Sequence, residues 1–228
     1  MFHVKHFFSE EIKRMGEVLM GWGVDISEEK MRIFSIYEDF LIQWNKRVHL
    51  VSRGDEEKIV SKHFLESLAL LRIFDFTEPK RMMDLGPGAG FPSIPLKILF
   101  PEIILLLVES NRKKYLYLKE LIDTLELNDV SLACERIENM GDSRLLNSFD
   151  VITARTVAPI DKIISWTIPF LKFSNQDKNG GVLVIPYSLK KKSIFSDNSF
   201  RNTNMREEVV YVDSKKKLRF LLFYKTGT

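Results

Sequence analysis

Apolar residues in the first third of the chain recur at the spacing of one helical face, in three successive runs. The first run lies in Glu11–Gly21, the second follows Ser27, and the third follows Asp55. Their apolar positions are Ile12, Met15, Val18 and Leu19; Met31, Phe34, Tyr37, Leu41 and Trp44; and Ile59, Phe64, Leu68 and Leu71. Ser and Asp are good helix-starting residues, and stripes of this kind usually pack into a core. The pattern therefore predicts a helical cap over residues 1–78.

Beyond this cap, short apolar runs alternate with amphipathic stretches. The predicted strands are Arg81–Leu85, Ile103–Glu109, Val130–Cys134, Phe149–Ala154 and Val182–Pro186, and the predicted helices are Phe91–Phe100, Asn111–Leu125 and Ile160–Phe173. Such alternation indicates an α/β fold with a doubly wound, mostly parallel sheet, because right-handed crossovers allow few other arrangements. Two final runs, Glu207–Val212 and Arg219–Tyr224, predict an antiparallel hairpin that completes seven strands. This α/β domain would span residues 79–228, with Ser188–Met205 polar and irregular.

The segment between the first predicted strand and helix carries the pattern D-x-G-x-G-x-G, from Asp84 through Gly86, Gly88 and Gly90. Glycines at such a turn let the backbone approach a ligand without a Cβ atom in the way. Glu109 ends the next strand, about 20 residues on, where nucleotide-binding α/β folds place a carboxylate against ribose hydroxyls. Capping of the helix that begins near Asn111 is the structural alternative for this side chain.

The spacing of these glycines excludes two common nucleotide sites. A dinucleotide fingerprint, G-x-G-x-x-G, would need its third glycine at Phe91 or at Ser93. A P-loop would need Gly-Lys-Ser/Thr at the end of the turn, which is absent. An adenosine site without a tight pyrophosphate cradle remains, and it fits S-adenosyl-L-methionine. Phe91 would pack either on this cofactor or on the core.

Two further stretches follow strand ends. Arg136-Ile137-Glu138 comes after the third strand, where adenine is usually held by a backbone N–H and a neighbouring acid; a role without ligand contact is the alternative. Arg155 follows the fourth strand, beside the switch point at which open α/β sheets bind ligands. Its guanidinium could pair with the methionine carboxylate or with an RNA phosphate, or lie on a surface loop.

Composition places the chain among ordinary soluble globular proteins, with 228 residues, 45% apolar residues, 29% charged residues and a formal charge of +3. Basic residues gather in Arg112–Lys114, Lys190–Lys192 and Lys215–Lys217, either as solvated surface or as a phosphate-binding face. The longest apolar run, Ile103–Val108, is too short to cross a bilayer, and the first residues carry no secretion signature. We expect a cytoplasmic protein, a monomer, without membrane association.

Residues that could hold a metal or form a disulfide are few. Cys134 is the single cysteine, which forbids an internal disulfide and suits a reducing cytosol; it is expected to face the core of its strand. The four histidines show no ligand spacing, and no C-x-x-C occurs, so we predict no metal site.

Four stretches of the chain carry a more specific pattern. They are N-K-R-V-H-L (Asn45–Leu50), K-H-F-L-E-S-L-A (Lys62–Ala69), D-L-G-P-G-A-G-F-P-S-I-P-L (Asp84–Leu96) and A-R-T-V-A (Ala154–Ala158). Together they resemble, in the same order, the bacterial small-subunit ribosomal RNA methyltransferase G family, formerly called glucose-inhibited division protein B. The glycine motif followed by F-P-x-I-P-L is the specific part of the resemblance, which runs from about Phe40 to Pro186.

The resemblance implies a Rossmann-like, S-adenosyl-L-methionine-dependent methyltransferase fold with an N-terminal helical cap. It implies methylation of N7 of a guanine in the decoding-region loop of 16S rRNA, either in the naked RNA or in an assembling small ribosomal subunit. The cofactor contacts that it implies are Gly86, Phe91, Ile137, Glu138 and Arg155, to which the general fold adds Glu109 and the glycine loop adds Gly88. Asn45, Lys46 and His63 match cap motifs that face RNA or join the cap to the sheet.

Three residues depart from the family pattern: Pro87 replaces the usual Thr, Ser93 the usual Gly, and Thr156 changes Arg-Ala to Arg-Thr. None of them removes a group that the chemistry needs.

Guanine N7 has a free lone pair and no proton, so no catalytic general base is expected, and the chain shows no Ser-His-Asp or Cys-His arrangement. The residues leave three other functions open. One is a methyltransferase that acts on a small molecule or protein. Another is a nicotinamide-dependent oxidoreductase, which the missing third glycine counts against, and the last is a non-enzymatic nucleotide-binding regulator.

Overall fold

The computed structural model describes residues 8–78, 80–155, 157–173, 180–187, 203–212 and 216–225. Several sequence-based expectations fall outside these residues. They concern the cluster Lys190–Lys192, Lys215, Thr156, and the stretch from Ser188 to residue 202.

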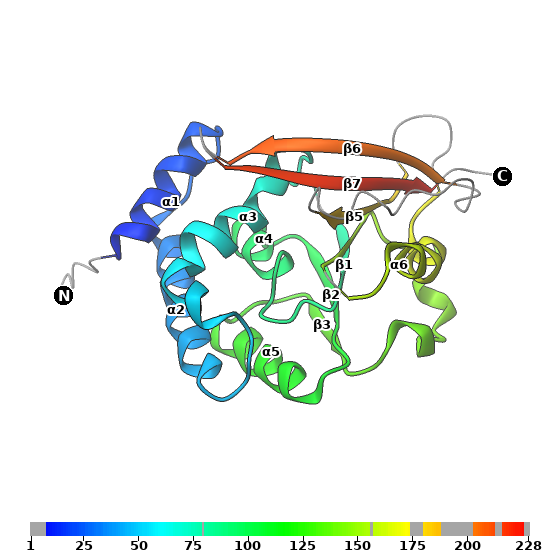
Figure 1. Cartoon of the computed structure of the whole chain (residues 1–228), viewed down its shortest axis with the longest axis horizontal. Helices are drawn as coiled ribbons and strands as arrows, with labels where there is room; N and C mark the ends of the chain where they lie inside the picture. The colour runs from blue at the N-terminus through cyan, green and yellow to red at the C-terminus, as the bar shows by residue number, and fades with distance from the viewer. Residues whose placement is uncertain are drawn as a thin grey trace.

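The element order is that of an alternating α/β chain (Figure 1). The helices are α1 (Glu10–Gly21), α2 (Glu28–Asn45), η1 (Arg53–Lys58), η2 (Ile59–Phe64), α3 (Leu65–Leu68), η3 (Ala69–Arg72), α4 (Ser93–Leu99), α5 (Arg112–Thr124), η4 (Ile137–Asn139), η5 (Ser143–Leu145), α6 (Ile160–Thr167) and η6 (Ile168–Phe170). The strands are β1 (Arg81–Leu85), β2 (Ile104–Val108), β3 (Val130–Ala133), β4 (Val151–Ala154), β5 (Val182–Pro186), β6 (Thr203–Tyr211) and β7 (Lys217–Lys225). The η elements are 3₁₀-helical, except for η2, which is a π-helix.

The strands form one seven-stranded sheet in the order β3-β2-β1-β4-β5-β7-β6. Strands β1 to β5 are parallel, and β7 runs antiparallel to both β5 and β6. The chain first builds outward from β1 through β2 to β3 and then returns to pair β4 with the other side of β1. The predicted doubly wound, mostly parallel fold with a closing hairpin is thus confirmed, and β1 and β4 flank its switch point.

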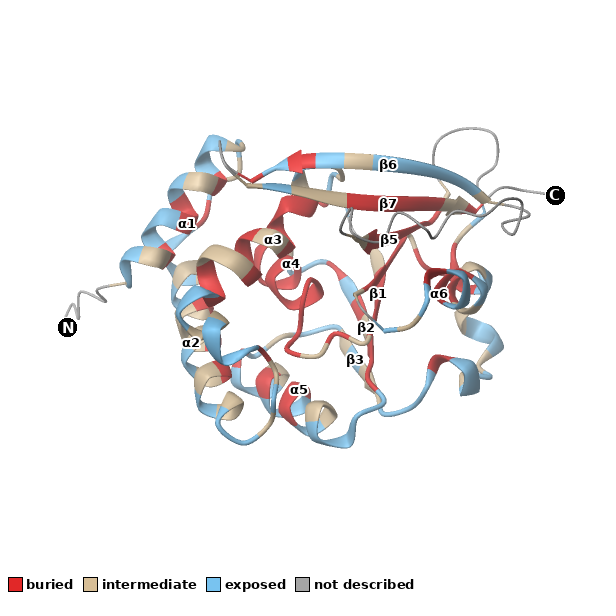
Figure 2. Cartoon of the chain, viewed as in Figure 1, coloured by how far each residue is buried: buried red, intermediate tan, exposed pale blue. Residues whose placement is uncertain are grey.

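Alternate residues along the strands point to two separate cores, as the pleat of a sheet requires. Met82 and Leu105 belong to the core that α1, α2, α4 and α5 cover, whereas Met83 and Ile152 belong to the core beneath α6. Figure 2 shows buried residues concentrated in the central strands and in α4, whose seven residues are all buried. The predicted cap shares its core with one face of the sheet; its boundary at residue 78 stays a prediction.

The first two predicted helices are present, and the third is broken. Ser9 and Ser27 cap α1 and α2, each accepting a backbone N–H through its hydroxyl. The run after Asp55 forms η1, η2, α3 and η3 in turn. Ser67 Oγ donates to the carbonyl of His63 at 2.6 Å, and side-chain bonds of this kind bend helices. The stripe still serves packing, since Ile59, Phe64 and Leu68 are fully buried.

The boundaries of α6 and β6 differ from the predicted ones. Helix α6 ends at Thr167, because Pro169 has no N–H to continue the α-helical bonding, and a 3₁₀ turn follows. Strand β6 begins at Thr203, inside the stretch that was expected to be irregular. The expectation that Cys134 faces the core was wrong: this cysteine is exposed. It lies one residue beyond β3, an edge strand that is only partly buried.

No helix within the described ranges is both long and apolar enough to span a bilayer. In the same part of the chain, no group of three or more His, Cys, Asp or Glu side chains is arranged to hold a metal ion.

A buried carboxylate lies at the end of the central strand. Asp84 is fully buried and accepts hydrogen bonds from Ser93 Oγ at 2.5 Å and Thr153 Oγ1 at 2.9 Å. Burial raises the pKa of the Asp84 carboxyl to about 7, although the hydrogen bonds from Ser93 and Thr153 act in the opposite direction. Ser93, one of the three residues that depart from the pattern of the similar family, thus supplies a hydroxyl donor that glycine lacks.

This raised pKa predicts a specific dependence of stability on pH. The unfolded chain releases the Asp84 proton near pH 4, whereas the folded chain holds it to about pH 7. The contribution of the protonated Asp84 to the free energy of unfolding is therefore complete below about pH 4. It is lost as the pH rises through about 7. We expect Asp84→Asn to remove this decline, a difference of about 1.4 kcal/mol per unit of pKa shift. Urea unfolding between pH 4 and 8 measures it, with the exposed Asp123→Asn as the matched control; parallel profiles for wild type and Asp84→Asn would contradict it.

Candidate functional site

The glycine loop lies where β1 and β4 end side by side, at the switch point of the sheet. Gly86, Gly88 and Gly90 all have positive φ, at 66°, 59° and 101°. A Cβ atom at Gly86 would lie 2.6 Å from Val157 Cγ2, and one at Gly90 would lie 2.6 Å from the Tyr37 hydroxyl. At Gly88 the nearest atom would be Lys114 Nζ, at 3.9 Å. Gly86 and Gly90 therefore permit close packing, whereas Gly88 opens onto free space.

That space is a cavity of about 380 Å³, which we call the loop cavity. Its lining residues are Leu50, Val51, Ser52, His63, Gly86, Pro87, Gly88, Ala89, Phe91, Glu109, Ser110, Lys114, Arg155 and Val157. Six residues that the sequence analysis singled out thus meet around one cavity: Gly86, Gly88, Phe91, Glu109, Arg155 and His63. They come from the ends of β1, β2 and β4 and from the N-terminal helical segment.

Glu109 ties the glycine loop to the start of α5. Its Oε2 accepts the Gly88 N–H at 3.2 Å, and its Oε1 accepts the Asn111 N–H at 2.8 Å. Asn111 itself caps α5 through its side chain. A carboxylate has about four lone-pair positions, so these two bonds leave acceptor capacity for a ligand in the loop cavity.

Two tyrosines hold the other end of the glycine loop. The hydroxyls of Tyr37 in α2 and Tyr117 in α5 both donate to the carbonyl oxygen of Ala89, at 2.6 Å and 3.1 Å. Both side chains are fully buried, and burial is the main cause that raises the pKa of each phenol above its ordinary value. The loop conformation therefore depends on a residue of the N-terminal helices as well as on the sheet domain.

Phe91 stands between the loop cavity and the core. It is buried, and its ring stacks on His63 with centroids 5.1 Å apart and planes at 6°. Neither ring nitrogen of His63 has a hydrogen-bond partner among the described residues. Burial and then the charge of Arg155 lower the pKa of His63 to about 4. His63 is thus a neutral ring at the cavity wall, and both of its ring nitrogens are buried, Nε2 lying 3.7 Å from Asp55 Oδ2.

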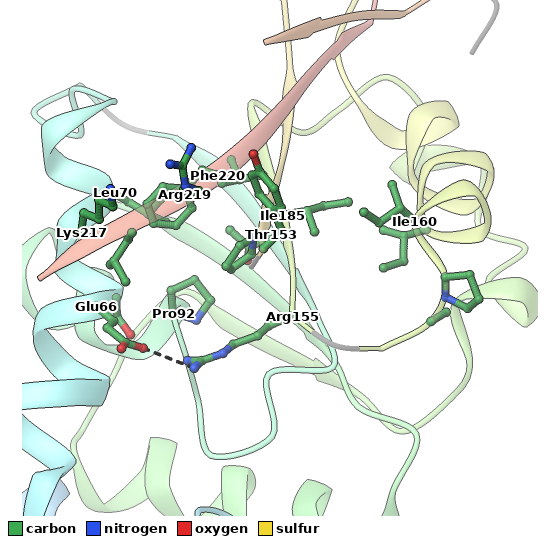
Figure 3. Close-up of a pocket in the computed structure, with 18 residues that line it drawn as sticks. Glu66, Leu70, Pro92, Thr153, Arg155, Ile160, Ile185, Lys217, Arg219 and Phe220 are labelled. Carbon is green, nitrogen blue, oxygen red and sulfur yellow. Dashed lines mark hydrogen bonds and ion pairs between the residues drawn. The ribbon is translucent and has the colours of Figure 1, made fainter. Parts of the chain in front are cut away.

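Arg155 separates the loop cavity from a second one. This larger cavity, of about 610 Å³, lies beyond the ends of β4 and β5 and reaches β7 and α6. Its lining residues are Glu66, Ser67, Leu70, Pro92, Thr153, Arg155, Ala158, Pro159, Ile160, Ile163, Val184, Ile185, Pro186, Tyr187, Lys217, Leu218, Arg219 and Phe220. In Figure 3 the Arg155 guanidinium points toward the Glu66 carboxylate at one edge of this cavity.

Glu66 fixes the position of Arg155. Its Oε2 lies 3.3 Å from Arg155 Nη2, and its Oε1 lies 3.2 Å from Lys216 Nζ. The carboxylate is only 15% exposed, so water screens these ion pairs less than it screens surface pairs. A residue of the helical segment thereby orients an arginine that lines both cavities.

The remaining predicted residues lie outside the loop cavity lining. Ile137 is buried beneath α6, and Glu138 is exposed. Both lie on the turn that follows β3. The carbonyl oxygen of Ala133 in β3 accepts the Glu109 N–H at 3.0 Å. Lys46 is exposed. Asn45 organises the segment after α2: its Oδ1 accepts the N–H groups of Leu50 and Val51, and its Nδ2 donates to Glu56.

Sequence reasoning missed several residues of the site. Tyr37 carried a signal only as one member of an apolar stripe, and Tyr117 fell within an amphipathic run. Glu66 lies within one of the motifs, but no local pattern indicates its role, because its partner Arg155 is 89 positions away in the sequence. Pairings at such separation leave no trace in local patterns.

Comparison with known proteins gives the family. The model of the family "rRNA small subunit methyltransferase G" matches residues 30–220. Ribosomal RNA small subunit methyltransferase G of Staphylococcus aureus (strain JH9) is 36% identical over 165 residues, which make up 72% of this chain and 69% of that protein. The protein of the same name from Thermoanaerobacter sp. (strain X514) is 34% identical over the same shares.

Solved structures agree on the fold. The O-methyltransferase TomG of Streptomyces achromogenes, in complex with SAM, has a TM-score of 0.54 at 16% identity, covering 96% of this chain and 100% of that one. A mutant of MtNAS in complex with S-adenosylmethionine has a TM-score of 0.55 at 15% identity, covering 97% and 99%. The methyltransferase family and fold confirm the predicted cofactor, S-adenosyl-L-methionine. By its matched residues and its relatives, the chain belongs to the rRNA small subunit methyltransferase G family.

Proposed function

We propose that this protein transfers a methyl group from S-adenosyl-L-methionine to N7 of a guanine in the decoding-region loop of 16S rRNA. The observation that carries the proposal is the pair of cavities on either side of Arg155, one at the glycine loop and one large enough for a nucleobase. The family supports rRNA as the acceptor. The substrate would be the naked RNA or an assembling small subunit, and the protein would act as a cytoplasmic monomer.

The cofactor would lie in the loop cavity. Glu109 would accept ribose hydroxyls with its remaining lone pairs, and Gly86 and Gly88 would let the backbone approach the ligand. Ile137 and Glu138 would hold adenine, at the turn beside the β2 end. Arg155 would face the methionine carboxylate, and Phe91 would pack against the cofactor. A bound cofactor would supply the electrophilic methyl group.

The acceptor base would enter the larger cavity. Its walls are mainly apolar, with Leu70, Ile185 and Phe220 among them, which suits the flat faces of a purine removed from its stack. Because N7 carries a lone pair and no proton, the protein needs only to orient the base and exclude water. Asn45, Lys46 and His63 would serve the RNA side: Asn45 by shaping the segment beside the loop cavity, Lys46 by phosphate contact, and His63 as a ring in the cavity wall that stacks on Phe91.

The two tyrosine hydroxyls yield a prediction about cofactor affinity. Tyr37→Phe or Tyr117→Phe alone leaves the Ala89 carbonyl one partner, so each should weaken S-adenosylhomocysteine binding by about 2- to 10-fold, the equivalent of one neutral hydrogen bond. The double variant leaves a buried carbonyl unsatisfied and should lose more than either single variant. Calorimetry measures the dissociation constants, with Tyr115→Phe in α5 as the matched control. If the double variant only lowers the melting temperature and keeps its affinity, the hydroxyls serve folding alone.

Gly88 and Glu109 test the location of the cofactor. A valine at position 88 would project into the loop cavity from a residue with φ of 59°, so Gly88→Val should abolish the stabilisation by S-adenosylhomocysteine that wild type shows in a melting experiment. Glu109→Ala should weaken binding by about 1–3 kcal/mol. Gly141→Val is the matched control, since a Cβ atom there meets nothing within 4 Å. Normal affinity in both site variants would move the site elsewhere, and stabilisation of wild type by NAD but not by S-adenosylhomocysteine would contradict the methyltransferase function.

The product supplies the direct test of the acceptor. Methylation at N7 fixes a positive charge on the base and weakens its glycosidic bond, so reduction followed by aniline treatment cleaves the strand there. Primer extension on wild-type rRNA should stop at one decoding-loop guanine, and the stop should vanish in a deletion strain. A wild-type copy should restore it and a Gly88→Val copy should not. A stop that persists in the deletion strain would remove 16S rRNA as this protein's acceptor and leave a small molecule or protein acceptor.

A further inference from the structure

Two short segments that border the loop cavity carry basic side chains and no acidic ones. Residues 46–53, after α2, contribute Leu50, Val51 and Ser52 to the cavity lining, and the start of α5 contributes Lys114. The Lys and Arg residues are Lys46, Arg47 and Arg53 on the first segment, and Arg112, Lys113 and Lys114 in the first turn of α5. Neither residues 46–53 nor residues 110–119 contain an Asp or Glu.

These six side chains, which we call the cationic rim, are held on one side of the molecule by packing between their elements. The Trp44 and Tyr117 rings meet edge to face with centroids 5.7 Å apart, which joins the end of α2 to α5, and Figure 1 shows these two helices side by side. Asn45 fixes the fold of residues 46–53 through the Leu50 and Val51 N–H groups. The rim is therefore a surface with fixed geometry next to the loop cavity.

The charges of the rim have no carboxylate partners in the part of the chain that the structure describes, although the Arg112 guanidinium lies 5.9 Å from the centroid of the Tyr115 ring. Five of the six side chains are exposed, Lys114 is half-buried, and none takes part in an ion pair with a described residue. The β6–β7 hairpin differs: Arg206 pairs with Glu208, and Arg219 pairs with Glu207. Unpaired cations on both sides of one cavity fit a polyanion better than they fit a neutral partner.

We infer that the cationic rim binds the phosphates of the RNA strand on either side of the target nucleotide. The inference rests on the proposed function and adds the direction from which RNA approaches: across residues 46–53 and the start of α5. Phosphate contacts of this kind fix the position of a nucleic acid and give affinity without reading its sequence. The RNA would then run past the loop cavity, while the extruded base turns into the larger one.

The salt dependence of RNA binding tests this inference. The probes are deproteinised small-subunit rRNA and small ribosomal subunits from a deletion strain, each titrated over a range of salt concentrations in the presence of S-adenosylhomocysteine. Each lost phosphate contact lowers the slope of log K against log salt by about 0.7 for single strands and 0.9 for duplex. Lys46→Ala/Arg47→Ala and Arg112→Ala/Lys113→Ala should therefore each flatten the slope by about 1.4–1.8.

Matched controls separate the rim from overall charge. Arg14→Ala/Arg32→Ala removes two exposed arginines of α1 and α2 and should leave the slope unchanged. All three double variants should keep the wild-type dissociation constant for S-adenosylhomocysteine. Unchanged slopes for both rim variants, or equal flattening by the control pair, would overturn the inference. If wild type binds this RNA but methylates neither probe, the proposed function fails instead.

Discussion

The carbonyl oxygen of Ala89 is the point on which the site depends, because the hydroxyls of Tyr37 and Tyr117, from two helices far apart in the sequence, converge on it. A buried carbonyl must find donors, and here they come from α2 of the helical segment and from α5 of the sheet domain. The glycine loop is therefore held in its conformation by residues that cannot move without exposing apolar surface. Gly90 makes this possible, since any Cβ atom there would collide with the Tyr37 hydroxyl.

The same dependence on both parts of the chain recurs around Arg155. The sheet places this arginine at the end of β4, and Glu66 of the helical segment sets the direction of its guanidinium. Lys216, before β7, holds the other oxygen of that carboxylate. The wall between the two cavities is thus built from three distant segments. A substitution at Glu66 would therefore alter both cavities together, because Arg155 lines both of them.

How much of this was predictable from sequence depends on the distance between interacting residues. The strands, the parallel order and the glycine loop follow from local periodicity and spacing, and so does the position of Glu109. The prediction that Cys134 faces the core was wrong because periodicity gives no sign that β3 is an edge strand of the sheet. Helical spacing marked Tyr37 as a core residue, but the loop carbonyl that its hydroxyl holds is 52 positions away. The larger cavity could not be predicted at all, since its walls combine α6, β5, β7 and the helical segment.

The central claim is that the cofactor and the acceptor base occupy neighbouring cavities separated by Arg155. A crystal structure of the protein with S-adenosylhomocysteine, one expected product, and 7-methylguanosine monophosphate, the modified nucleotide of the other, tests it most directly. We expect the nucleoside of the first ligand at the glycine loop, with its ribose at Glu109. We expect the purine of the second ligand in the larger cavity, with its N7 methyl group toward the sulfur. Both ligands in one cavity, or the purine bound away from Arg155, would contradict the account.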